Sequence, residues 1–179
     1  MRVYSQWLVA LVACLLLAAP VCAQKEKREP LTDAQIEEIR EASVDPVARV
    51  NIYTKILSEH AVAIKALGSR AHSAARSSRM DDGLQDFIAL MDELGSNLDV
   101  YAERKADIRK ALKPLNDAAP RWLEMLRALP AEPSFYLARK EAIESGKDLA
   151  DQAKLLLDEQ DAYFKAHKDE QGQERAEPK

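Results

Sequence analysis

The chain has 179 residues, with 26 Lys and Arg against 30 Asp and Glu and a formal net charge of −4. This acidic balance favours solubility and excludes a global attraction to nucleic acid or to acidic membranes. Only 5 glycines occur, while Ala, Leu, Glu, Lys, Asp and Arg dominate, so the composition is typical of a helical protein.

Residues 1–23 have the layout of a secretory signal peptide. Arg2 precedes an apolar run over residues 7–19, and small side chains occupy the expected cleavage positions before Gln24. We expect cleavage after Ala23, which predicts an exported protein, periplasmic or secreted, with no transmembrane segment in the mature chain. Residues 24–30 then form a charged leader.

The cysteines raise one alternative for this N-terminal region. Cys14 follows Leu-Val-Ala, a sequence that resembles a lipobox, but acylation at Cys14 would leave the apolar residues 15–19 at the start of the mature chain. Cleavage after Ala23 instead removes both Cys14 and Cys22, which excludes thiol catalysis and disulfides. Roughly 155 residues remain, enough for one domain with its own core.

Capping signals mark the first two helices. Thr32 and Gln35 form a capping box, which predicts a short helix ending near residue 42. Asp45 followed by Pro46 begins the next helix, whose apolar positions recur every three or four residues up to Gly68. We expect residues 69–79 to be a frayed connection, with the following helix opening at residues 81–83.

The longest apolar pattern runs through residues 84–129 with alternating steps of three and four. Lys105 is its only charged member. Pro114 and Pro120 each remove a backbone donor and crowd the preceding turn. These prolines must kink or break the element, and we therefore expect a long helix over about residues 82–113 and a shorter helix ending near Leu129.

Pro130 and Pro133 indicate a turn, followed by a last long helix to about Ala166. Residues 168–179 have no apolar face, so we expect a disordered polar tail. The predicted fold is all-α: an up-and-down antiparallel bundle of three to four long helices plus one short N-terminal helix, with the bundle domain spanning residues 31–167.

Motifs that carry chemistry are missing from the sequence. It contains no HExxH, no Glu three residues before a histidine, no GxSxG elbow and no glycine-rich phosphate loop. We therefore expect no enzyme activity, no catalytic residue, no metal and no cofactor.

One pair of residues supports an alternative function as a haem, metal or small-molecule binder. His60 lies in the apolar stripe of its helix, and a hairpin turning near residue 75 would bring it level with Met91. A His and a Met on neighbouring helices are the axial ligands by which some cytochromes hold haem. Ordinary core packing is the simpler explanation of the same two residues.

A local basic patch supports the leading functional hypothesis. Between Glu59 and Asp81 no acidic residue occurs, but Lys65, Arg70, Arg76 and Arg79 do. Such a patch suits a phosphate-rich surface, an anionic lipid head group or an acidic partner. We expect a non-enzymatic binding or scaffolding module that contacts an unknown protein or component of the cell envelope, without sequence-specific nucleic-acid binding.

A resemblance to a known family is found in two stretches of the sequence, "DPVARVNIYTKILSEHAVAIKAL" and "LQDFIALMDELGSNLDVYAERKADIRKAL". They are similar to an uncharacterised family of exported bacterial all-helical proteins with no assigned activity. The resemblance covers about residues 31–129 and implies export and a helical bundle, with no site residue to carry over. Pro114 and Pro120 depart from the more continuous helix that it implies.

Overall fold

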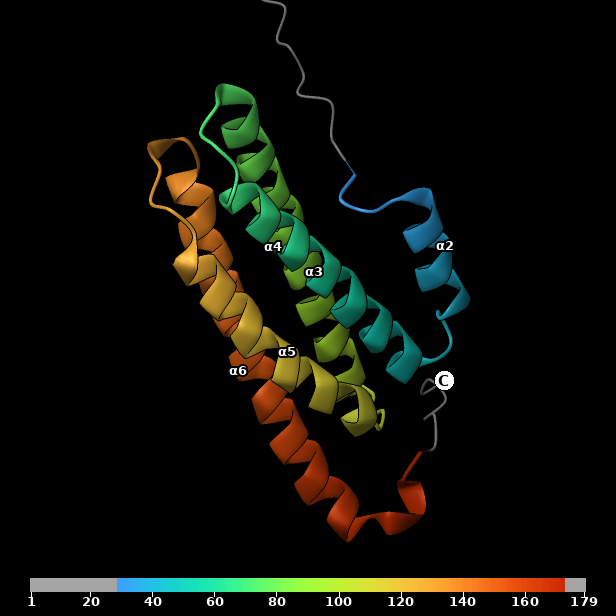
Figure 1. Cartoon of the computed structure of the whole chain (residues 1–179). Coiled ribbons are helices and arrows are strands. Elements are labelled where there is room, and N and C mark those ends of the chain that lie inside the picture. The colour runs from blue at the N-terminus through green and yellow to red at the C-terminus, as the bar shows by residue number, and fades with distance from the viewer. Residues whose placement is uncertain (1–28, 173–179) are drawn as a thin grey trace, which may run out of the picture.

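A computed structural model describes residues 29–172, which are all-α (Figure 1). A short N-terminal helix precedes four long packed helices, so the predicted fold class is confirmed. The helices are α2 (Asp33–Glu41), α3 (Pro46–Gly68), α4 (Ala74–Glu103), α5 (Arg109–Ala128) and α6 (Tyr136–Ala166), with 3₁₀ turns η1 (Pro133–Phe135) and η2 (Lys168–Glu170). The predicted signal peptide and its cleavage site lie outside the described residues.

The four long helices run up and down in a ring. Around the ring, α3 packs against α4, α4 against α6, α6 against α5 and α5 against α3, while α2 packs on α3. The α3–α4 and α5–α6 connections, residues 69–73 and 129–135, therefore lie together at one end, which we name the upper end (Figure 1). The α4–α5 connection lies at the opposite, lower end.

The predicted apolar stripes form the core. The alternating pattern supplies fully buried side chains from both α4 and α5, among them Leu84, Phe87, Leu94, Leu98, Leu112, Leu115 and Leu126. Phe87 and Trp122 pack edge to face with their ring centroids 6.0 Å apart. This geometry is favourable for aromatic pairs and joins α4 to α5 across the core.

Helix α4 begins earlier than the sequence predicted. Its N-cap is Ser73, whose side chain accepts a hydrogen bond from the Arg76 amide, so the helix opens at Ala74 and not at residues 81–83. Arg76, Ser77 and Met80 are already buried in the packing. The predicted frayed connection over residues 69–79 thus shortens to residues 69–73.

The end of α4 also differs from the prediction of a helix to residue 113. The chain turns at Lys105, which has φ 51°, and the amide of Ala106 donates to the carbonyl of Tyr101. This is the left-handed helix ending usually made by glycine. The buried amide of Gln160 then accepts from Ile108 N at 3.1 Å and donates to Ala106 O at 2.8 Å.

Both prolines that were expected to kink or break a helix lie inside α5. Each removes one backbone hydrogen bond and crowds the preceding turn, but α5 continues through both, with its apolar face buried along its length. The prediction of a boundary near Pro114 was therefore wrong, since the break occurs at residues 104–108.

The predicted disordered tail begins with ordered structure. In η2, Glu170 accepts a hydrogen bond from the Tyr163 hydroxyl at 2.7 Å, and the Gln171 side chain donates to the Phe164 carbonyl at 2.8 Å. These bonds fold residues 168–172 back against the end of α6. Residues 173–179 lie outside the described part of the chain.

Candidate partner-binding site

The upper end collects basic residues from two distant segments. Residues 65–79 and 121–140 together contain eight Lys and Arg but only two Glu, in a chain whose net charge is −4. The antiparallel packing of α3 with α4 and of α5 with α6 brings these segments to the same end of the bundle (Figure 1). The cations of these two segments are therefore gathered at the upper end.

Arg76, one of the four residues of the predicted patch, has a structural role. It is only 6% exposed, and its Nη1 lies 2.6 and 2.8 Å from the two carboxylate oxygens of Glu132. Its Nε donates to the carbonyl of Leu67 at 3.0 Å. Arg76, in the first turn of α4, thus ties the end of α3 to the α5–α6 connection, and its charge is offset within the protein.

The other three residues of the predicted patch, Lys65, Arg70 and Arg79, are exposed. They are joined by exposed cations that the sequence reasoning missed, namely Arg121, Arg127 and Lys140. The missed signal was topological: once α5 and α6 form an antiparallel pair, their connection must share an end with the α3–α4 connection.

A groove of about 550 Å³ lies between two of these cations. Lys65 of α3 and Arg121 of α5 line it together with Glu124, over apolar side chains that include Met125 and Leu129. The groove therefore combines a predominantly basic rim with an apolar floor.

Two exposed apolar side chains lie at the same end. Tyr136 is 52% exposed and Leu137 76% exposed, both in the first turn of α6. The turn that presents them is held by Arg139, which donates to the carbonyls of Leu126 at 2.9 Å and Arg127 at 2.7 Å. These bonds satisfy carbonyls at the C-terminal end of α5 and fix its position relative to α6.

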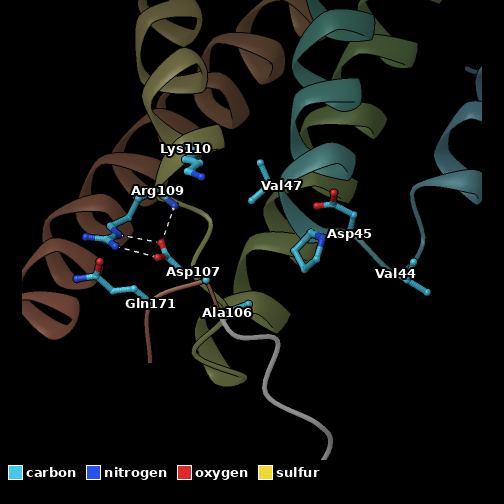
Figure 2. A pocket seen from close by; sticks show the side chains of 10 residues that line it. Val44, Asp45, Val47, Ala106, Asp107, Arg109, Lys110 and Gln171 are labelled. Atoms are coloured by element: carbon cyan, nitrogen blue, oxygen red, sulfur yellow. Dashed lines mark hydrogen bonds and ion pairs between the residues drawn. The ribbon is translucent and has the colours of Figure 1, made fainter. Parts of the chain in front are cut away.

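A second cleft, of about 650 Å³, opens at the lower end (Figure 2). Val44, Asp45 and Val47 line one side, and Asp107, Arg109 and Lys110 line the other. Acidic and basic side chains are balanced here. The cleft therefore has no excess charge of one sign to attract a charged partner.

Two of the residues that line this lower cleft, Asp107 and Arg109, form an ion pair with each other. Arg109 donates from Nε and Nη2 to the two carboxylate oxygens of Asp107, each at 2.8 Å, and packs 4.7 Å from the centre of the Phe164 ring. The hydrogen bonds from Arg109 lower the pKa of the Asp107 carboxyl, and the same contact raises the pKa of Arg109. Both groups stay charged at neutral pH and stabilise each other.

His60 and Met91 lie on neighbouring helices. His60 is half-buried in α3, while Met91 is buried in α4 with its sulfur 3.5 Å from the position that a Cβ on Gly146 of α6 would take. Met91 therefore takes part in the packing between α4 and α6. Among residues 29–172, no three His, Cys, Asp or Glu side chains gather closely enough to hold a metal ion.

A buried tyrosine links α3 to α4 in mid-bundle. The Tyr53 hydroxyl donates a hydrogen bond to the Glu93 carboxylate. Burial, followed by this carboxylate, raises the pKa of Tyr53 well above its usual range, so the phenol stays protonated and the contact is structural.

In the described part of the chain, no helix combines the length and the apolarity needed to cross a membrane. Comparisons with protein-family models, with curated proteins and with solved structures give no match. The all-helical character implied by the sequence resemblance is confirmed, and no family is identified.

Proposed function

We propose that the chain is an exported, non-enzymatic helical bundle that binds a negatively charged partner in the cell envelope through its upper end. The observation that carries this proposal is the excess of cations there: six of the eight basic residues are exposed, beside one exposed acidic residue, Glu124, within the same two segments. Export is supported by the signal-peptide layout of residues 1–23.

Fold stability does not account for this clustering. Like charges brought together repel one another, and the one buried cation of the cluster, Arg76, already has its counter-charge in Glu132. Within residues 29–172, Lys65, Arg70, Arg79 and Arg121 form no ion pair closer than 4.0 Å. Binding of an anionic partner would relieve the repulsion between these cations, and this relief would favour binding.

The charged groups also support a binding role over a catalytic one. Catalysis by acids and bases needs groups whose pKa values are shifted toward neutrality in an accessible site. Here the pKa shifts of Asp107, Arg109 and Tyr53 all stabilise their ordinary charge state at neutral pH. These groups serve to hold helices together.

The test is charge reversal with a matched control. The triple variant Arg70→Glu, Arg79→Glu, Arg121→Glu removes exposed cations of the upper end, while Lys113→Glu, Lys154→Glu, Lys165→Glu makes the same change in net charge elsewhere on exposed sites. Binding of labelled poly-L-glutamate is measured by fluorescence anisotropy at rising salt concentration.

We expect the upper-end variant to lose affinity by about tenfold or more and the control to keep most of it, with wild-type binding weakened by salt. Equal losses in the two variants would show that only net charge matters and would overturn the proposal. Absence of wild-type binding both to poly-L-glutamate and to vesicles of anionic lipid would do the same.

A further inference from the structure

We infer that the negatively charged partner is an anionic lipid surface, onto which the bundle docks with its upper end; this inference rests on the proposed function. Its basis is the combination, at one end, of exposed cations from all four long helices and their connections with the exposed apolar pair Tyr136 and Leu137. Anionic membranes attract basic surfaces, and apolar side chains add affinity by entering the interface.

The cations are spread around the end and do not converge on one groove. Lys65 belongs to α3, Arg79 to α4 and Arg121 to α5, and Lys140, which lies 3.7 Å from Glu144 in an exposed pair, belongs to α6. Of these cations, a ligand lodged in the groove would meet only Lys65 and Arg121, beside the carboxylate of Glu124. An extended surface facing the end of the bundle would reach cations of all four helices, which is why a lipid surface fits better than a single acidic peptide.

The distance of these cations from the upper ends of their helices also matches the dimensions of a membrane surface. At about 1.5 Å rise per residue, Lys65, Arg121 and Lys140 lie within about two helical turns, or roughly 10 Å, of the ends of their helices. This is comparable to the thickness of a lipid headgroup layer. The cations can therefore meet headgroup phosphates while the bundle stands on the surface.

Tyr136 and Leu137 supply the apolar contact. Both lie in the first turn of α6, immediately after the buried Phe135 that anchors this turn in the core. A tyrosine suits the membrane interface because its ring is apolar and its hydroxyl stays hydrated. Leu137 projects into solvent, and burial among lipid chains would remove its apolar surface from water.

The experiment measures co-sedimentation of the protein, as isolated from cells, with two kinds of vesicle: phosphatidylcholine alone, and phosphatidylcholine mixed with phosphatidylglycerol. The double variant Tyr136→Ser, Leu137→Ser removes the apolar contact. Leu155→Ser is the matched control, since Leu155 is 60% exposed on α6 away from its first turn. Poly-L-glutamate binding is measured in parallel on every variant.

We expect salt-sensitive binding to the phosphatidylglycerol vesicles and little to phosphatidylcholine alone. The double variant should lose roughly tenfold in vesicle affinity with its poly-L-glutamate binding unchanged, and Leu155→Ser should match the wild type. Each upper-end cation replaced by a neutral residue should cost roughly fivefold.

The contrary outcomes separate the two proposals. Binding to poly-L-glutamate without binding to phosphatidylglycerol vesicles would overturn the lipid inference, leave the proposed function standing and point to an acidic protein. Binding to neither probe would overturn both. Equal affinity for the two kinds of vesicle, or vesicle binding untouched by Tyr136→Ser, Leu137→Ser, would also contradict docking of the upper end on anionic lipid.

Discussion

Arg76 and Glu132, 56 residues apart in the sequence, form a largely buried ion pair that joins the first turn of α4 to the α5–α6 connection. The side chain of Arg76 is 5% exposed and that of Glu132 is 19% exposed. The pair therefore fixes the surface on which the exposed cations are displayed, without contributing free charge to it.

Removing one partner of this pair should destabilise the fold. Glu132→Leu leaves the buried guanidinium of Arg76 without its counter-charge, which we expect to cost about 3 kcal/mol in the free energy of unfolding, measured with urea. The double variant Arg76→Met, Glu132→Leu should cost clearly less than the sum of the two single changes, because no buried charge is left unpaired.

The control is the exposed pair of Arg40 and Glu37, whose side chains are 69% and 54% exposed. Glu37→Leu should change the free energy of unfolding by less than about 0.5 kcal/mol. Additive effects of Arg76→Met and Glu132→Leu would show that the two side chains do not act as a pair.

Among the polar side chains of the lower end, Gln160 should be the one whose substitution lowers the free energy of unfolding most. Its replacement in Gln160→Leu leaves the buried amide of Ile108 and the carbonyl of Ala106 without partners, at a cost of about 2–3 kcal/mol. Gln152→Leu is the control, because Gln152 makes partly exposed bonds to Gly95 and Asp99. Urea unfolding of both variants measures the difference, and equal costs would contradict the role given to Gln160.

The ion pair of Asp107 and Arg109 predicts a stability change in acid. Because the folded state lowers the pKa of Asp107, the unfolded state binds its proton first as pH falls. The contribution of Asp107 is therefore fully present above the ordinary Asp pKa of about 3.9 and is lost as pH falls through the lower folded value.

The measurement is the free energy of unfolding as a function of pH for the wild type and Asp107→Asn. The variant should be less stable at neutral pH, and the gap should narrow in acid. Asp161→Asn is the control, since Asp161 is 56% exposed and lies 3.4 Å from Arg109; it should change the profile little. A constant gap between wild type and Asp107→Asn at every pH would contradict this linkage.

The sequence predicted the core better than the helix boundaries. Spacing of three and four correctly marked Leu98 and Leu112 as buried, but the same spacing continues across the turn between them. The break depends on the left-handed conformation of Lys105 and on Gln160, a residue far along the chain. Periodicity cannot report either, whereas both prolines that suggested a kink or a break lie inside the continuous helix α5.

Only part of the candidate site could be predicted from the sequence, because the rest depends on contacts between distant segments. Lys65, Arg70 and Arg79 stand in a stretch free of acidic residues, so composition alone marks them. The burial of Arg76 depends on Glu132, and the addition of Arg121 depends on which helix ends meet. Both require the long-range packing that local patterns do not contain.

Amide hydrogen exchange read by mass spectrometry, with and without poly-L-glutamate, tests most directly whether the upper end binds the anionic partner. The predicted result is added protection in peptides covering residues 65–79 and 121–140, lost when salt is raised. Protection centred instead on residues 42–47 and 104–110, around the lower cleft, would contradict the proposed site.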